Sequence, residues 1–335
     1  MQDKLVLEGA PEQSVETISE QQVEEVEGPA RVSKDDLTVV VPVLNEEKGV
    51  VAVIDDIFQK GYENILVVDG YSTDNTFNAA QQRGVTVVTQ HGRGKSGAIK
   101  TAIEHVSTPY LLVMDGDYTY DASDIQRFLN HAKVYDEIVG SRHAKHISWL
   151  HRFGNGGITW IFNVLFGTTF SDVCSGMYLL RSMACKHLTL QTKGFSIEVE
   201  ILAQMSTQGR VTEVPINYRK RIGDAKLTTW KAGADIIKTI IELARIYNPV
   251  FLFSVTTASA AIPGVAILAW VFILWLAGSE HIFHSAWALA AAMLLLLASQ
   301  AFIIGTVALL LKRSELRIER LVRTEIEDNQ SESNR

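Results

Sequence analysis

Residues 37–69, LTVVVPVLNEEKGVVAVIDDIFQKGYENILVVD, contain the pattern of a strand, a helix and a second strand in direct succession. The two ends of this stretch, Leu37–Val43 and Asn64–Val68, are short apolar runs rich in valine, which is typical of strands buried on both faces. Glu46–Lys60, between them, has the length and composition of a helix. The stretch therefore predicts a strand–helix–strand unit with parallel strands.

The same alternation continues along the chain. Further strands are expected at Val85–Thr89 and Tyr110–Met114, and further helices at Asp74–Arg83 and Lys95–Val106. Repeated alternation predicts an α/β fold, in which a mostly parallel sheet carries helices on both faces. Ligands of such sheets bind beyond the carboxyl ends of the strands, so the residues that follow each strand are the first candidates for a site.

Two carboxylates follow the fourth expected strand, in Asp115-Gly116-Asp117. On an extended segment the side chains of residues i and i+2 point to the same side, so both carboxylates can face one ligand. Oxygen ligands of this kind suit Mg²⁺ or Mn²⁺, held by one or two carboxylates together with substrate phosphates. The alternative is a polar turn in which Asp121 caps the following helix.

Polar residues also follow the other strands. Asp69 ends the second strand, where an acidic side chain can accept hydrogen bonds from a base or ribose. The segment His91–Gly97 (HGRGKSG) lacks the first glycine of a phosphate-binding P-loop, because Thr89 stands at that position. What remains is a glycine-rich helix start whose backbone amides can approach a nucleotide.

Together these motifs resemble the GT-A (Rossmann-like) glycosyltransferases of family 2, and among them the dolichyl-phosphate mannose synthase group of polyprenyl-phosphate sugar synthases. The similarity covers about residues 37–228. It rests on Val41-Pro42…Asn45-Glu46, Asp69-Gly70…Ser72-Thr73-Asp74, Gly94-Lys95, Asp115-Gly116-Asp117, Gly140-Ser141-Arg142, Ser171-Asp172…Ser175-Gly176, Gly194-Phe195…Glu198 and Val214-Pro215…Arg221…Gly223…Lys226-Leu227. The chain departs from the family pattern at Val68 and Tyr71, because the family often has Asp-Asp-Gly-Ser over 68–71. It departs again at Ala225, where Ser often precedes the Lys-Leu pair.

The resemblance implies roles for individual residues. The donor nucleotide is expected to contact Pro42, Asn45, Glu46, Asp69 and Lys95. Asp115 and Asp117 would bind the Mg²⁺ or Mn²⁺ that bridges the diphosphate. The basic residues expected near the diphosphate or the lipid phosphate are Arg142, Arg152, Arg221 and Lys226. Asp117, Arg142 and Arg221 are the residues expected to act in the transfer itself.

The C-terminal third has a different composition. Val250–Ala277 and Ser285–Leu311 hold 28 and 27 residues without a single Asp, Glu, Lys or Arg, and about 20 apolar residues span a bilayer as helix. Residues 249–312 are therefore predicted to form a transmembrane hairpin, and a fully soluble protein is excluded. The connector carries no Lys or Arg, whereas 313–335, expected to be a basic and then polar tail, begins with several. The catalytic domain and both termini are therefore expected on the cytoplasmic side.

Two amphipathic segments precede the hairpin, Ile147–Phe166 and residues 228–248. Each is either an ordinary core helix or a helix lying in the membrane interface. The aromatic residues and the nearby hairpin favour the interface for 228–248, and both interpretations stay open for Ile147–Phe166. Residues 1–34 are predicted to be a disordered acidic tail, because Met1–Glu27 has eight acidic residues, one Lys and no apolar core. The catalytic domain is thus expected over 35–227.

The net charge of −7 indicates no nucleic-acid partner. The sequence predicts an inverting glycosyltransferase of the plasma membrane or an endomembrane. It would transfer mannose, glucose or N-acetylglucosamine from a GDP- or UDP-sugar to dolichyl or polyprenyl phosphate. One alternative is a glycan-extending or polysaccharide-synthesising family 2 enzyme, which the missing Gln-x-x-Arg-Trp motif disfavours. The other is a non-catalytic nucleotide-sugar-binding scaffold, which the intact Asp115 and Asp117 disfavour.

Overall fold

The computed structural model describes residues 32–142, 149–186, 188–191, 196–222, 229–278 and 282–333. Nearly all of the acidic tail predicted over 1–34 lies outside these residues. The strands are β1 Leu37–Val43, β2 Ile65–Asp69, β3 Thr86–Thr89, β4 Tyr110–Val113, β5 Glu137–Arg142, β6 Tyr178–Arg181 and β7 Val211–Ile216. The helices are α1 Glu47–Gln59, α2 Thr76–Gln81, α3 Gly94–His105, α4 Ile125–Leu129, α5 Trp149–Phe166, α6 Ser182–Cys185, α7 Ile197–Gln208, α8 Thr229–Tyr247, α9 Pro249–Leu276 and α10 Ile282–Ser333. Short 3₁₀ turns are η1 Lys34–Asp36 and η2 Ala122–Asp124.

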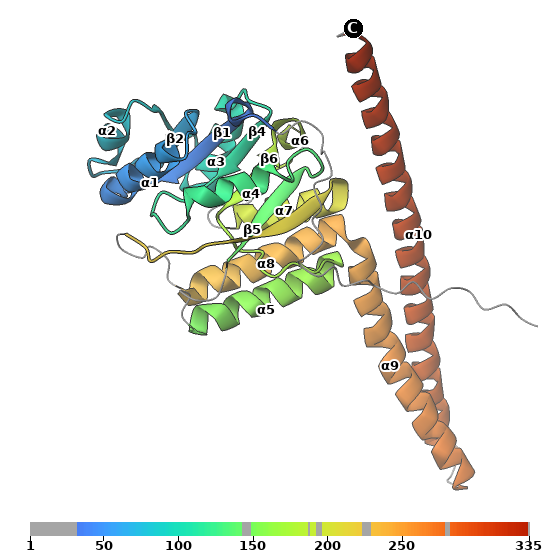
Figure 1. Ribbon diagram of the computed structural model, residues 1–335. Coiled ribbons are helices and arrows are strands. Elements are labelled where there is room, and N and C mark those ends of the chain that lie inside the picture. The colour runs from blue at the N-terminus through green and yellow to red at the C-terminus, as the bar shows by residue number, and fades with distance from the viewer. Residues whose placement is uncertain are drawn as a thin grey trace, which may run out of the picture. The chain divides into compact units, whose positions relative to one another are not determined.

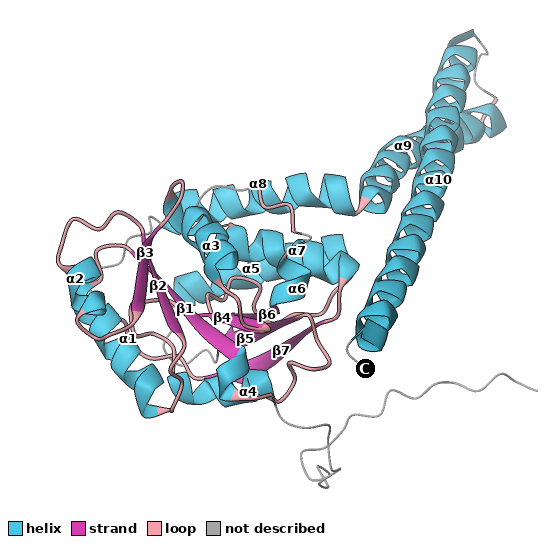
Figure 2. Cartoon of the chain, turned by 90° about the horizontal axis from the view of Figure 1, so that it is seen from above, coloured by secondary structure: helices cyan, strands magenta, loops and turns pink. Residues whose placement is uncertain are grey.

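The strands form one sheet in the order β3-β2-β1-β4-β6-β5-β7, seen edge-on between its helices in Figure 2. Only β6 runs antiparallel to its neighbours, β4 and β5. The mostly parallel sheet predicted from the sequence is therefore confirmed. The four predicted strands and three predicted helices all form, within one or two residues of the expected bounds.

Each face of the sheet is covered because the central strands are apolar on both sides. On β1, Val39 and Val41 pack with α1 in one hydrophobic cluster, whereas Val40 packs with α3 and α7 in another. A third cluster joins α5, α7 and α8, and includes Phe162, Leu202 and Ile240. α5 and α8 lie side by side in both ribbon views (Figures 1 and 2). One face of each amphipathic segment is thus buried in protein.

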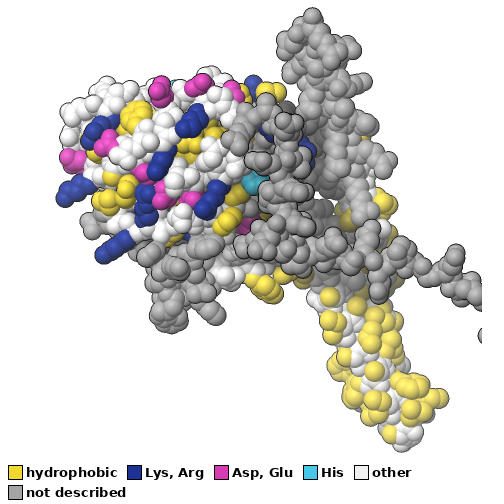
Figure 3. All heavy atoms as spheres, in the orientation of Figure 1, with side chains coloured by type: hydrophobic (Ala, Val, Ile, Leu, Met, Phe, Trp, Pro, Cys, Tyr) yellow, Lys and Arg dark blue, Asp and Glu magenta, His cyan; other side chains and the backbone are white. Residues whose placement is uncertain are grey.

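The last two helices are long and apolar. Phe253–Leu276 in α9 and Ser285–Leu311 in α10 are long and apolar enough to cross a membrane. The two helices pack closely, since a Cβ on Gly305 would lie 2.7 Å from the Cβ of Phe253. Their outward surface is densely hydrophobic (Figure 3). α10 runs without interruption through Ser333, so most of the segment expected as a basic and then polar tail is helical.

Candidate active site

The ends of three adjacent strands bring the predicted donor residues together. Because β2, β1 and β4 are neighbours, the segments after Val43, Asp69 and Val113 lie at one edge of the sheet. Asn45 joins two of these segments: its amide donates to Ser72 Oγ at 2.8 Å, and its Oδ1 accepts from the Thr73 amide at 2.7 Å. Asn45 has φ of 50°, a left-handed conformation that Asn tolerates better than most residues.

Asp69 is buried at the end of β2. Its Oδ2 accepts a hydrogen bond from the Ser72 amide at 3.0 Å. Its Oδ1 is also buried but has no partner in the described part of the chain. An unpaired buried carboxylate oxygen is costly, so this atom is suited to accept a hydrogen bond from a ligand. Pro42 lies on the neighbouring strand, in register with Val68.

Lys95 connects the predicted metal loop to the interior. It lies in the first turn of α3, and its Nζ is 2.5 Å from both Asp115 Oδ1 and Glu198 Oε1. Burial opposes the charge of Lys95, but the two carboxylates outweigh it and raise the pKa of the ammonium group well above its ordinary value. Lys95 is therefore a fixed positive charge behind Asp115. Gly176 makes room for the cluster, because a Cβ there would lie 2.9 Å from the Lys95 Nζ.

Asp117 is held from two sides. Its Oδ1 accepts hydrogen bonds from the Thr119 amide at 3.1 Å and hydroxyl at 2.5 Å, and its Oδ2 lies 3.2 Å from Arg221 Nη1. Burial and the nearby Asp115 raise the pKa of its carboxyl group, and the hydrogen bonds from Thr119 and the charge of Arg221 oppose this. Arg221 also pairs with Glu46, while its buried Nε has no partner among the described residues.

This donor set fits a hard divalent cation. The described residues hold no group of three or more His, Cys, Asp or Glu side chains that could enclose a metal. Mg²⁺ does not need such a cage, because it commonly binds one or two carboxylates and completes its shell with water and substrate phosphates. Asp115 and Asp117 can supply those carboxylates at the open end of β4. Asp121, the cap named in the alternative interpretation of this loop, does accept a hydrogen bond from the Ser123 amide at 2.9 Å. The metal-binding role of Asp115 and Asp117 stays a prediction.

The segment after β7, residues 217–222 and called here the strap, is hydrogen-bonded to the loop that carries Asp117. The amide of Arg219 donates to Thr119 O at 2.7 Å, and that of Ile222 donates to Asp117 O at 3.0 Å. The Arg219 guanidinium lies 2.8 Å from Asp56 and 2.5 Å from Asp121. It also lies 4.8 Å from the ring centroid of Tyr118, a residue with φ of 66°. Sequence reasoning missed Arg219; its only local signal is the basic run 219–221 directly after a strand.

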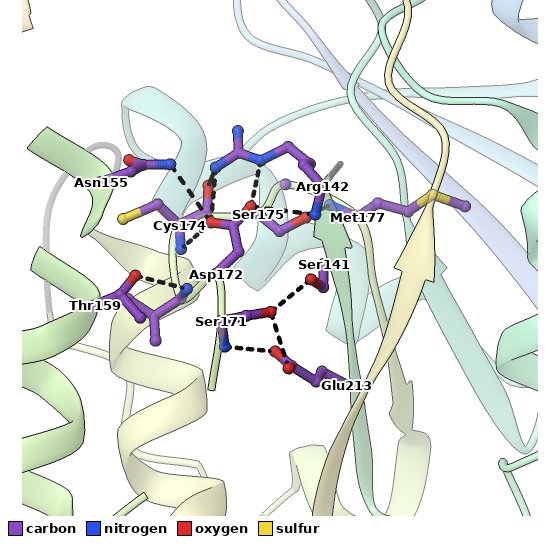
Figure 4. Close-up of polar contacts among 12 residues, drawn as sticks. Ser141, Arg142, Asn155, Thr159, Ser171, Asp172, Cys174, Ser175, Met177 and Glu213 are labelled. Carbon is purple, nitrogen blue, oxygen red and sulfur yellow. Dashed lines mark hydrogen bonds and ion pairs between the residues drawn. The ribbon is translucent and has the colours of Figure 1, made fainter. Parts of the chain in front are cut away.

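Arg142 lies at the carboxyl end of β5, in the network of Figure 4. Its Nε and Nη2 contact the two oxygens of Asp172 at 2.6 and 2.9 Å, and Nη2 also donates to Cys174 O at 3.1 Å. Burial raises the pKa of the Cys174 thiol to about 12, so this cysteine is a poor nucleophile. Below the pair, Ser171 donates from both amide and hydroxyl to Glu213, at 2.8 and 2.9 Å.

Comparisons with known proteins show the family of the chain. The model of Glycosyl transferase family 2 matches residues 38–188. The protein named glycosyltransferase AglJ, from Haloferax volcanii, is 32% identical over 254 residues, which are 73% of this chain and 84% of that protein. The chain belongs to glycosyltransferase family 2. This family 2 glycosyltransferase is also 32% identical over 216 residues to the dolichyl-phosphate hexose transferase of the same organism, with 62% of this chain and 94% of that one covered.

A solved structure confirms the GT-A-like fold of this family 2 glycosyltransferase. Glucosyl-3-phosphoglycerate synthase from Mycobacterium tuberculosis, in complex with Mn²⁺, UDP-glucose and phosphoglyceric acid, matches with a TM-score of 0.53 at 17% identity. The match covers 62% of this chain and 79% of the synthase. Likeness at this identity concerns the fold alone.

Two predicted site residues of the family 2 glycosyltransferase are not placed by the structure. Arg152 belongs to α5, but its side chain lies outside the described residues. Lys226 lies outside them altogether. The other predicted residues form two groups. The donor group lies at the ends of β1, β2 and β4, with Lys95 of α3 and Arg221 of the segment after β7 joined to it by ion pairs. Arg142 lies apart, at the end of β5. Their roles toward ligands stay predictions.

Proposed function

We propose that this family 2 glycosyltransferase moves one hexose or N-acetylhexosamine from a GDP- or UDP-sugar to dolichyl or polyprenyl phosphate. Mannose, glucose and N-acetylglucosamine are the candidate sugars. The name of the Haloferax volcanii dolichyl-phosphate hexose transferase supports both the hexose and the lipid acceptor. The two apolar helices in the same chain support an acceptor that is held in a membrane.

Two buried side-chain atoms without partners give the proposal its main structural support. The buried Asp69 Oδ1 is an acceptor without a donor, and the buried Arg221 Nε is a donor without an acceptor, in the described chain. Buried polar groups are nearly always satisfied, so both point to a ligand that brings a hydrogen-bond donor for one and an anionic oxygen for the other. A nucleoside diphosphate sugar has both, with its base or ribose for Asp69 and its phosphates for Arg221.

The residues of this site are suited to managing charge. A lipid phosphate is anionic near neutral pH, so the attacking oxygen needs no strong general base. Lys95 keeps a positive charge behind Asp115, and Arg221 can exchange its carboxylate partners for the diphosphate. Arg142 keeps its Nε and Nη2 on Asp172 and the Cys174 carbonyl, so it would meet the incoming phosphate through Nη1. Direct attack by the lipid phosphate predicts inversion at the anomeric carbon.

Asp115 and Asp117 would hold the Mg²⁺ or Mn²⁺. Bound there, the ion would supply Lewis-acid stabilisation of the diphosphate leaving group. The presence of Mn²⁺ with UDP-glucose in the M. tuberculosis synthase supports this cofactor. The two carboxylates of the chain would place the ion at the end of β4, next to the fixed charges of Lys95 and Arg221.

We further propose that α5 and α8 lie at the membrane surface beside the spanning hairpin. Their buried faces pack on the catalytic body, yet their outer faces keep large apolar side chains exposed, among them Trp160 on α5 and Ile246 on α8. An exposed tryptophan among apolar side chains is typical of a membrane interface. The basic residues after α10's apolar span favour a cytoplasmic location for the catalytic body and both termini, in the plasma membrane or an endomembrane.

The function is tested on membranes that contain the full chain. They are incubated with radiolabelled GDP-mannose, UDP-glucose or UDP-N-acetylglucosamine and with polyprenyl phosphate, and the lipid is extracted into organic solvent. We expect one donor to label the lipid, and label to be absent with Asp115→Asn. An exposed matched control, Asp55→Asn, should label normally. Label that appears only in polymer or glycan would favour the glycan-extending alternative, and donor binding without turnover in any metal would favour the scaffold.

A further inference from the structure

Gln300 has an unusual position in α10. It lies near the middle of the candidate span Ser285–Leu311, and its side chain is exposed. At 3.6 residues per turn it points about 140° away from Gly305, which packs against Phe253 of α9. Gln300 therefore lies on the side of α10 that α9 leaves uncovered.

The carboxamide of Gln300 makes no side-chain hydrogen bond within the described residues. Its polar neighbours behave differently. The Ser299 hydroxyl donates to Leu296 O at 2.8 Å, and the Thr306 hydroxyl donates to Phe302 O at 2.9 Å. Both are thus satisfied by their own helix, as hydroxyl groups can be in a bilayer. Gln300 alone of the three carries an unpaired polar group into the hydrocarbon region.

The residues around Gln300 form a regular stripe, called here the α10 seam. Its members follow one another at spacings of four and three, the heptad pattern of a two-helix coiled coil. They are Met293, Leu297, Gln300, Ile304, Val307, Leu311, Ser314 and Ile318. The large apolar members expose between 49% and 67% of their surface, so the described chain leaves the seam uncovered.

Lipid alone accounts poorly for this seam. Acyl chains offer no hydrogen bond to the Gln300 carboxamide, and an unsatisfied polar group in hydrocarbon is costly. The seam also continues to Ile318, which is 61% exposed and lies seven residues beyond the end of the apolar span. Both features are explained by a second helix that packs along the seam from the middle of the span to beyond its end.

We propose that the α10 seam binds the α10 seam of a second copy of this chain, with Gln300 facing Gln300. Copies inserted with the same topology present parallel helices, so a two-fold axis along them places each residue opposite its equivalent. A carboxamide is both donor and acceptor and is therefore complementary to itself. This inference rests on the membrane location proposed above and adds a homodimer in which one polar residue sets the register.

Disulfide cross-linking of the full-length protein in native membranes tests the contact. Membranes are first washed with alkaline carbonate, then oxidised. We expect Leu297→Cys and Ile304→Cys to give covalent dimers. Phe302→Cys is the matched control, since Phe302 is 64% exposed but lies on another side of the helix, and it should stay monomeric. The wild-type chain, with Cys174 and Cys185, sets the background.

A second measurement isolates Gln300. Gln300→Leu should weaken dimerisation about 5- to 30-fold in energy-transfer titrations in liposomes, while Gln300→Asn and Phe302→Leu should leave it close to wild type. The dimer would be overturned if the protein resists carbonate but Leu297→Cys and Ile304→Cys give no cross-links, or if Gln300→Leu dimerises as strongly as wild type. Either result would leave the proposed function untouched. Protein removed by carbonate would overturn both the dimer and the membrane location. Labelling of polyprenyl phosphate is scored separately.

Discussion

The guanidinium of Arg142 and the carboxylate of Asp172 form a two-point ion pair, with Nε–Oδ2 at 2.6 Å and Nη2–Oδ1 at 2.9 Å. Both side chains are largely buried. The pair therefore fixes the plane of the guanidinium at the carboxyl end of β5, where the acceptor phosphate is proposed to bind. An arginine held in this way is preorganised for a second anion.

Arg142→Ala should impair use of the lipid phosphate more than binding of the nucleotide. Loss of hydrogen bonds to a charged group predicts a fall of about 10- to 100-fold in kcat/KM for polyprenyl phosphate, because each such bond is worth about 1.5–3 kcal/mol. Arg142→Lys keeps the charge but loses the planar guanidinium, so its kcat/KM for polyprenyl phosphate should lie between those of wild type and Arg142→Ala. The check is steady-state kinetics with varied acceptor, alongside calorimetric titration of the nucleotide. Equal loss of both would place Arg142 at the diphosphate.

Asp115→Asn and Asp117→Asn should each abolish turnover and the metal dependence of donor binding, with the fold retained. Asn keeps the size of the side chain but lacks the charge that a divalent cation requires. Nucleotide titrations with and without Mn²⁺, together with circular dichroism, provide the measurement. Asp55→Asn serves as control, since Asp55 pairs with Arg83 on the surface. Wild-type activity in excess chelator would show that no metal takes part.

Arg219→Ala should loosen the strap without removing any group that the proposal places on a ligand. Arg219 pairs with Asp56 and Asp121 and so holds the strap in place. The strap also carries Arg221, which contacts Asp117. We expect a higher Mn²⁺ concentration for half-maximal activity and a higher KM for the donor. Arg219→Lys should restore part of both, whereas Arg210→Ala, at the opposite end of β7, should change neither. Unchanged metal and donor dependence would mean that the strap does not need its arginine.

The elements that the sequence predicted are those whose signal is local. The first four strands and three helices are continuous patterns, so their presence and the parallel direction of the strands could be predicted from the alternation. β6 could not be placed, because an antiparallel strand inserted between β4 and β5 depends on pairing with segments far away in the chain. For 313–335 the sequence indicated a charge pattern but no secondary structure, and α10 continues through this segment to Ser333.

The candidate site divides in the same way. Asp69, Asp115 and Asp117 could be named as candidates because each ends a strand or lies shortly after one, and the topology brings these strand ends together. The ion pairs around these residues could not be predicted. Arg219 contacts Asp56, 163 residues earlier, and Arg221 contacts Glu46, 175 residues earlier. Only the folded chain decides which cation meets which carboxylate.

Glu137→Gln should stabilise the protein at neutral and alkaline pH. Glu137 begins β5 and is only 2% exposed, and its Oε2 has no partner in the described structure. Burial raises the pKa of this carboxyl well above its ordinary value. Below about pH 4.3, the ordinary pKa of glutamate, both folded and unfolded chains hold the proton. Above it the unfolded chain ionises first, so stability falls by about 1.4 kcal/mol per pH unit until the folded group ionises too.

The glutamine side chain does not ionise in this pH range, so the stability of Glu137→Gln should not fall in this way as the pH rises. The Tm of the detergent-solubilised full chain should match wild type near pH 4, and the difference should grow in favour of Glu137→Gln toward pH 8. Asp55→Asn, which alters an exposed pair, should run parallel to wild type across the same range. A Glu137→Gln protein less stable than wild type at pH 8 would show that Glu137 is ionised in the fold and satisfied by a cation.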